Sequence, residues 1–202
     1  MNLLHLMKSK FSLIVIFFTV SFISLLGIYQ FKEKTYGFVS EKKLKDFSLK
    51  NLDEKNFRIN SLKGNSVFLY FGYTNCKRYC PNSLKLLKKL ADSLKENDVR
   101  FVFISIDSNR DKTEELTKLK KNFDERFIPL YGDENEVKQI AKEFSILYEE
   151  DKTNENELSI SHSSRIFLIS KDQEKYLIYP DNFFDLPKIL EDYRYINNSS
   201  NH

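Results

Sequence analysis

Two apolar runs separated by an amphipathic segment constrain the fold of this chain more than any other feature. The runs are SVFLYFGY at residues 66–73 and RFVFISID at residues 100–107, and both are short and rich in aromatic and β-branched residues, as buried strands are. Between them, residues 82–97 repeat leucine at helical spacing, at positions 84, 87, 90 and 94. These segments predict a strand, a helix and a second strand.

The same alternation continues towards the carboxyl terminus. We expect a short hairpin over residues 46–64 and a charged surface loop over residues 149–159. Helices are expected over residues 111–126, 134–146 and 183–196, and strands over residues 126–132, 165–170 and 175–180. This order predicts an α/β fold, with a mixed sheet covered by helices on both faces. Functional sites in such sheets gather at the C-terminal ends of the strands.

The amino-terminal region contains a long uncharged segment. Residues 11–29 are nineteen residues without a charged side chain, and a helix of that length spans about 28 Å, close to the thickness of a bilayer core. A cleaved signal peptide has a shorter apolar region and a small-x-small cleavage site, so we favour an uncleaved transmembrane helix. The flanking lysines are almost balanced, and a first helix usually inserts with its short end inside, so residues 1–10 are expected to be cytoplasmic.

After this anchor we expect a lysine-rich linker (residues 30–45), one domain (residues 46–196) and a disordered tail (residues 197–202). The chain has 32 basic and 29 acidic residues, and they are interspersed. Such a mixed surface gives no broad basic patch, so no nucleic-acid partner is expected. The expected location is a single-pass position in the inner (cytoplasmic) membrane, with the domain in the periplasm, or in the mitochondrial intermembrane space if the source is eukaryotic.

The chain has two cysteines, Cys76 and Cys80, directly after the first apolar run. On a helical turn, this spacing places two side chains about 40° apart on one face, which allows two thiolates to hold one metal ion and also allows a disulfide. Lys77, Arg78 and the nearby helix N-terminus favour the thiolate, which is the nucleophile and the metal ligand. Three roles stay open: a structural bridge, a redox pair and a metal clamp. A bridge that closes so short a loop adds little stability.

The expected domain contains one histidine, His162, because His5 precedes the anchor and His202 ends the tail. His162 leads into the strand at residues 165–170, at the end of the sheet where the cysteines should lie. Two thiolates and one imidazole form a soft set of three ligands, which suits Cu(I), whereas structural zinc normally has four ligands. These residues therefore favour copper over zinc. Asp107 ends the second apolar run and is either part of this site or a turn residue.

Three segments, in this order, resemble motifs of the SCO/SenC family of copper-delivery proteins. FGYTNCKRYCP (residues 71–81) looks like the family's FGYTxCxxxCP signature, and SISHSSRIFLI (residues 159–169) resembles its histidine segment. Between them, SIDSNRDKTEEL resembles a third motif, which it matches at Ser105, Asp107, Arg110, Asp111 and Glu114. The resemblance covers about residues 44–195.

The resemblance implies a thioredoxin-like fold and a copper site made by Cys76, Cys80 and His162, with Asp107 as an acidic residue near it. It also implies a copper chaperone that carries Cu(I) or Cu(II) and helps to metallate the binuclear copper centre of cytochrome c oxidase subunit II. The expected partners are that subunit or its apo form, other copper chaperones and, through residues 11–29, the membrane. Such a protein is a metallochaperone and not a turnover enzyme.

The second hypothesis is an enzyme, a membrane-anchored thiol–disulfide oxidoreductase. In it, one thiolate of the redox pair Cys76 and Cys80 attacks the disulfide of a client and the other resolves the mixed disulfide. Ser164 stands where ordinary thioredoxins have a proline, which counts against a general thioredoxin activity. Lys77-Arg78 stand where the SCO/SenC family often has Pro-Asp, a departure that leaves the exact client open and does not change the expected ligand set.

Overall fold

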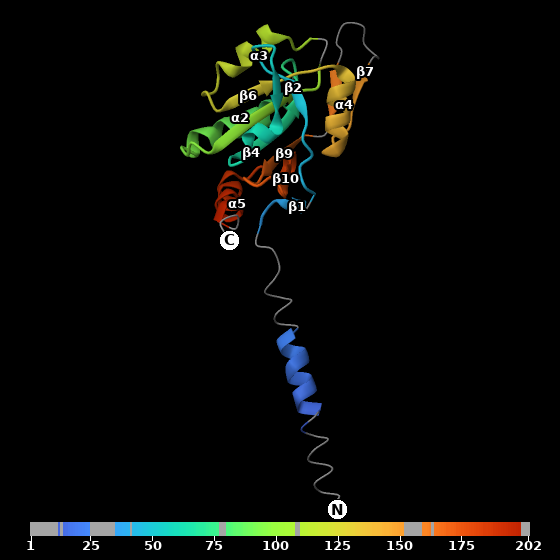
Figure 1. Ribbon diagram of the computed structural model, residues 1–202, viewed down its shortest axis with the longest axis vertical. Coiled ribbons are helices and arrows are strands. Elements are labelled where there is room, and N and C mark those ends of the chain that lie inside the picture. Colours follow the sequence, from blue (N-terminus) through green and yellow to red (C-terminus); the bar gives the residue numbers. More distant parts are fainter. Residues whose placement is uncertain are drawn as a thin grey trace, which may run out of the picture. The chain divides into compact units, whose positions relative to one another are not determined.

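The computed structural model describes residues 12, 14–24, 35–40, 42–76, 80–107, 110–151, 159–162 and 164–198 (Figure 1). The chain divides into two units, residues 1–34 and residues 35–202. In the first unit, residues 14–24 are helical. None of the described helices is both long enough and apolar enough to cross a bilayer. The expected cytoplasmic segment and residues 25–34 of the expected anchor and linker lie outside the described residues.

The second unit is built on a mixed six-stranded sheet with the strand order β1-β10-β9-β4-β5-β6 (Figure 1). One side of the sheet is parallel and consists of β4 (Ser66–Gly72), β5 (Val99–Ser105) and β6 (Phe127–Leu130). The other side is antiparallel and consists of β9 (Arg165–Ile169), β10 (Tyr176–Pro180) and β1 (Phe38–Ser40). Every residue of β4 is buried, as its continuous apolar run predicts for a strand that is covered on both faces.

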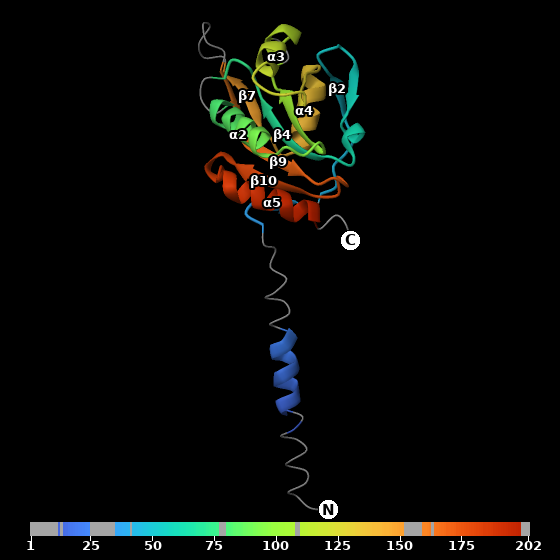
Figure 2. The same cartoon turned by 90° about the vertical axis from the view of Figure 1, so that its left-hand side faces the viewer.

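The described helices of this unit are α2 (Cys80–Ser93), α3 (Thr113–Lys120), α4 (Glu134–Glu143) and α5 (Leu186–Asn198). The ring of Phe68 in β4 lies 6.2 Å from that of Tyr193 in α5, and α2 lies beside α5 (Figure 2). Phe71 points to the opposite face of β4, because side chains alternate along a strand. Its ring lies 5.4 Å from that of Phe144, which directly follows α4. The sheet is therefore covered on both faces, and the predicted α/β architecture is confirmed.

Shorter elements complete the unit. Two-stranded sheets are formed by β2 (Ser48–Lys50) with β3 (Asn56–Arg58) and by β7 (Tyr148–Asp151) with β8 (Ser159–His162), and the 3-10 helices are η1 (Ile59–Leu62) and η2 (Asp181–Phe183). The expected hairpin over residues 46–64 thus corresponds to β2, β3 and η1. The expected surface loop at residues 149–159 is wrong at its two ends, because these pair as β7 and β8.

The linker expected over residues 30–45 is also wrong in part, because residues 38–40 form β1 and pair with β10. A distant side chain explains this strand. The buried carboxylate of Asp192 in α5 accepts hydrogen bonds from the backbone N–H groups of Tyr36 and Gly37, each at 2.8 Å. Two further boundaries differ: the helix expected over residues 111–126 ends at Lys120, and α5 extends to Asn198, into the expected tail.

The buried side chain of Arg126 fastens the end of α2 to the turn before β6. Its guanidinium donates to the carbonyl oxygens of Ala91 at 2.7 Å and Leu94 at 2.5 Å, and to the carboxylate of Asp124 at 2.6 Å. These bonds satisfy carbonyl groups at the end of α2 that have no partner within the helix. The hydrogen bond from Arg126 also lowers the pKa of Asp124.

Replacing Arg126 with methionine is expected to lower the free energy of unfolding by about 3 kcal/mol, because buried carbonyl groups lose a charged donor. Urea denaturation followed by circular dichroism measures this, with the exposed Arg194→Met as the matched control. Because the pKa of Asp124 is lowered in the folded chain, the ionised carboxylate stabilises the fold fully at a pH above its ordinary pKa of 3.8. This contribution to the free energy of unfolding is lost as the pH falls through the lowered pKa. Equal stability of the two variants would contradict this role of Arg126.

Candidate functional site

The cysteine loop, residues 73–76, follows β4 at the C-terminal end of that strand. Cys76 is buried, with 9% of its surface exposed, and its backbone N–H donates to the carbonyl oxygen of Tyr73 at 3.3 Å. Cys80 is the first residue of α2, and its side chain lies outside the described part of the structure, as do Lys77 and Arg78. The backbone thus places the two cysteines on either side of a short connection between β4 and α2.

Asp111 holds the cysteine loop in place from the neighbouring strand connection. One carboxylate oxygen accepts the backbone N–H of Thr74 at 2.9 Å and the hydroxyl of Ser105 at 2.7 Å, and the other accepts the hydroxyl of Thr74 at 2.5 Å. Asp111 is only 1% exposed. It therefore ties the residue two positions before Cys76 to the end of β5. Asp111 belongs to the third motif, but sequence reasoning gave it no role at the site.

Burial raises the pKa of Asp111 above its ordinary value of 3.8, although the hydrogen bonds from Thr74 and Ser105 act in the opposite direction. The negative charge of Asp107 raises this pKa further. Ionisation of Asp111 is thus less favourable in the folded chain than in the unfolded chain. The three donors fix the orientation of the carboxyl group, so the cysteine loop has one defined position relative to β5.

Asp107 lies at the end of β5 and is also buried, with 4% exposed. Its carboxylate accepts a hydrogen bond from the side chain of Arg110 and another from the backbone N–H of Arg110, at 3.2 Å. The guanidinium of Arg110 lies 5.8 Å from the centre of the Tyr73 ring, at the start of the cysteine loop. Asp107 was expected to be either part of the site or a turn residue. Its hydrogen bonds to Arg110 are those of a turn residue, and through Arg110 they place Asp107 beside the cysteine loop.

His162 is the last residue of β8, opposite Tyr148 of β7. It was expected on a loop before β9, and the β7–β8 hairpin supports it instead. Two residues later, the hydroxyl of Ser164 is hydrogen-bonded to the hydroxyl of Ser83 in the first turn of α2, at 2.8 Å, and both side chains are buried. This bond brings the segment that follows His162 against the helix that begins with Cys80.

The described contacts therefore bring together three segments: the cysteine loop, the first turn of α2 and the chain that follows β8. Among the described side chains, no group of three or more histidine, cysteine, aspartate or glutamate residues could hold a metal ion. The side chains of Cys80 and His162 are outside that set. The backbone brings the segments that carry Cys76, Cys80 and His162 to one end of the sheet.

The fold has the mixed sheet and helix arrangement of thioredoxin-like Sco proteins. The family model described as SCO1/SenC matches residues 39–196, so this chain belongs to the SCO1/SenC family. The family predicted from the three motifs is thereby confirmed. The matched region begins in β1 and ends in α5, so it includes both cysteines, Asp111 and His162.

Two relatives show how much of the chain is shared. A SCO2-like protein of Rickettsia prowazekii is 35% identical over 130 residues, which are 62% of this chain and 63% of the relative. The protein SCO1 homolog 1, mitochondrial, of Arabidopsis thaliana is 32% identical over 139 residues, which are 67% of this chain and 42% of the relative. The chain thus matches less than two thirds of the length of these two relatives.

Two solved structures are similar to this chain in both fold and sequence. Arabidopsis thaliana ScoI with copper bound is 30% identical, with a TM-score of 0.67, and the match covers 74% of this chain and 97% of that one. BsSco, described as a Sco-family cytochrome c oxidase assembly protein with a disulfide switch, is 27% identical, with a TM-score of 0.61. That match covers 77% of this chain and 94% of BsSco.

Proposed function

We propose that this chain is a membrane-anchored copper chaperone that delivers copper to the binuclear copper centre of cytochrome c oxidase subunit II. Membership of the SCO1/SenC family supports this proposal, as do the copper bound to Arabidopsis ScoI and the assembly role of the Sco family. In the proposal, residues 11–29 form the anchor, and the domain lies outside the cytoplasm.

The observation that carries the proposal is the hydrogen bond between Ser83 and Ser164, since it holds the start of α2 against the chain that follows His162. We assign copper, as cargo, to the two thiolates of Cys76 and Cys80 and the imidazole of His162. Thiolates are soft ligands that favour Cu(I), and three protein ligands leave room for a ligand of the client to join and replace them one at a time. The buried position of Cys76 limits the access of water to the cargo.

The cysteines also support a second function, the reduction of disulfides. The disulfide switch described for BsSco favours this alternative. One thiolate attacks a client disulfide, a mixed disulfide forms and one client thiolate leaves. The second cysteine then attacks the mixed disulfide, so the client gains two electrons and Cys76 and Cys80 become a disulfide. His162 has no necessary role in these steps, which separates the two functions experimentally.

The test uses the full chain in detergent micelles, with the cysteines reduced and Cu(I) supplied without oxygen. We expect about one copper per chain by elemental analysis, and transfer of that copper to the apo form of the copper domain of oxidase subunit II. Transfer is measured by copper analysis of the two proteins after they are separated. Failure to bind stoichiometric copper, together with reduction of an oxidised subunit II peptide by the metal-free chain, would overturn the chaperone in favour of the reductase.

A further inference from the structure

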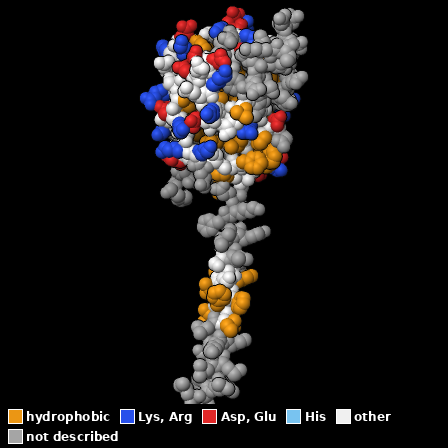
Figure 3. Space-filling model, turned by 90° about the vertical axis from the view of Figure 1, so that its right-hand side faces the viewer, with side chains coloured by type: hydrophobic (Ala, Val, Ile, Leu, Met, Phe, Trp, Pro, Cys, Tyr) orange, Lys and Arg blue, Asp and Glu red, His pale blue; other side chains and the backbone are white. Residues whose placement is uncertain are grey.

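Three aromatic rings form a partly exposed patch at the edge of the sheet. This β1 aromatic patch consists of Tyr36, Phe38 and Phe183: the ring of Phe183 lies 5.4 Å from that of Tyr36 and 5.1 Å from that of Phe38. Phe38 is 52% exposed, although it is large and apolar. The ammonium group of Lys188 lies 4.9 Å from the centre of the Tyr36 ring. Figure 3 shows hydrophobic side chains gathered on one face of this unit.

Hydrogen bonds and close packing attach residues 36–38 of the patch to the domain. Asp192 accepts the backbone N–H groups of Tyr36 and Gly37, and it also accepts the hydroxyl of the buried Tyr179 at 2.9 Å. A side chain at Gly37 would begin 2.5 Å from the ring of Tyr179, so the backbone packs directly on that ring. Phe38 then pairs with Ile178 in β10. The patch therefore has a defined position at the open edge of the sheet.

The length of the chain before the patch limits its distance from the proposed anchor. Five residues, 30–34, separate Tyr29, the end of the uncharged segment, from Thr35, where the second unit begins. The seven residue steps from Tyr29 to Tyr36 span at most about 25 Å when fully extended. Tyr36 and Phe38 follow directly. If residues 11–29 cross a bilayer, this length keeps Tyr36 within about 25 Å of the point where the chain leaves the bilayer core. The patch is therefore within reach of the headgroup region.

The composition of the patch suits this position. Tyrosine is favoured where a membrane meets water, and a lysine beside it can bury its stem while its ammonium group stays in water. An exposed Phe38 has a cost in water that contact with lipid removes. The chemistry and the length of the connection thus point to the same occupant, a lipid surface.

We propose that the β1 aromatic patch lies against the headgroup region of the membrane that holds residues 11–29. This inference rests on the proposed anchor. It also has a consequence for copper delivery, because β10 and β4 run in the same direction, each being antiparallel to β9. Phe183 follows β10 and the cysteine loop follows β4, so both lie at the same end of the sheet. Three strand spacings, about 14 Å, separate β1 from β4. The contact therefore holds the cysteine loop near a membrane-bound client.

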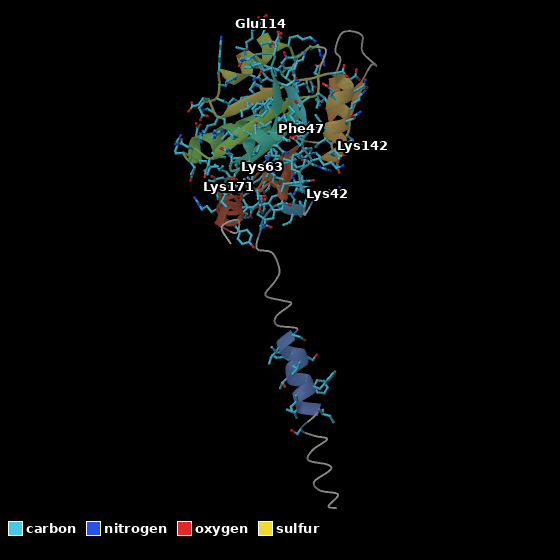
Figure 4. The ribbon with its side chains drawn as sticks, viewed as in Figure 1. Lys42, Phe47, Lys63, Glu114, Lys142 and Lys171 are labelled. Atoms are coloured by element: carbon cyan, nitrogen blue, oxygen red, sulfur yellow. The ribbon has the colours of Figure 1, made fainter. Side chains whose placement is uncertain are left out.

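The chain contains no tryptophan, so a single introduced tryptophan reports its own surroundings. The experiment places full-chain Phe38→Trp in nanodiscs of phosphatidylcholine and phosphatidylglycerol (3:1) that are bounded by a tryptophan-free aliphatic polymer, with and without brominated acyl chains, which quench tryptophan at short range. The matched control is Glu114→Trp on α3, which packs beside β6 at the opposite edge of the sheet and is labelled in Figure 4. Glu114 is exposed, and its described ion pair is with Lys118 on the same helix.

We expect brominated lipid to reduce the tryptophan emission of the Phe38→Trp chain at least twofold and to leave that of the Glu114→Trp chain almost unchanged. Equal quenching in the two variants, in chains that remain in the nanodisc fraction, overturns the patch proposal and leaves the anchor intact. A chain that does not enter the nanodisc fraction overturns the anchor and the patch proposal together. Circular dichroism of both variants confirms that each is folded.

Discussion

Replacing either Cys76 or Cys80 with serine is expected to lower the affinity of the reduced chain for Cu(I) by about a thousandfold, because a hydroxyl is a hard, weak ligand for a soft ion. Replacing His162 with alanine is expected to lower it by about tenfold, because two thiolates remain to hold the ion. Competition with a coloured Cu(I) chelator measures all three affinities. The side chains of Cys80 and His162 lie outside the described part of the structure. The order of these three losses in affinity therefore tests the ligand set independently of the structure.

His202→Ala is the matched control for the histidine variant, because it makes the same substitution at the last residue of the chain. It should leave the affinity for Cu(I) unchanged. An unchanged affinity in His162→Ala would remove His162 from the site. If both cysteine variants keep their affinity for Cu(I), Cys76 and Cys80 are not copper ligands. If His162→Ala still reduces an oxidised subunit II peptide at the rate of the unaltered chain, the thiol chemistry is independent of the imidazole.

The central part of the fold could be predicted because its signals are local. β4 and β5 are continuous apolar runs, and the leucine spacing of α2 places one face of that helix on the sheet. β1 could not be predicted in the same way. It is three residues long, and its position depends on the carboxylate of Asp192, which lies 155 positions away from Gly37 in the sequence. The β7–β8 hairpin is strongly charged, so it lacks the apolar alternation that marks most strands.

The candidate site divides in a similar way. Cys76 and Asp107 attract attention because they stand at or just beyond the end of an apolar run, and His162 because it stands just before the start of one. Asp111 stands beyond the end of β5 in the polar segment DKTEEL, where an acidic residue is ordinary at the start of a helix. Its hydrogen bonds to Thr74 and Ser105 arise only when β4 and β5 lie side by side. That contact is tertiary, so the third motif marks Asp111 but no local pattern reveals its partners.

Replacing Asp111 with alanine is expected to lower the free energy of unfolding by about 3 kcal/mol, because the backbone N–H of Thr74 and two hydroxyl groups lose their shared acceptor in a buried place. Urea denaturation of the full chain in micelles measures the loss. The matched control is Asp92→Ala, which removes an exposed carboxylate paired with Lys88 and should change stability by less than about 0.5 kcal/mol. Equal losses in the two variants would contradict the network.

The effect of pH gives Asp111 a signature of its own. Its pKa is raised in the folded chain, so the unfolded chain releases this proton first, and the stability contributed by Asp111 falls as the pH rises from the ordinary value of 3.8 through the folded value. Asp111→Asn, which cannot ionise, should lack this fall. The comparison requires unfolding measurements of both chains across that range.

A positioning role for Asp111 differs from a purely structural one in what it does to the folded chain. At a temperature where Asp111→Ala is still fully folded, a mispositioned cysteine loop should weaken Cu(I) binding by about tenfold, because Cys76 on a preorganised loop loses less entropy on binding than Cys76 on a loose one. Thr74→Val removes the hydroxyl donor and keeps the backbone donor, so it should have a smaller effect in the same direction. If stability falls in both variants while copper affinity stays unchanged, Asp111 supports only the fold, and the geometry of the copper ligands must be set by α2 and by the contact between Ser83 and Ser164.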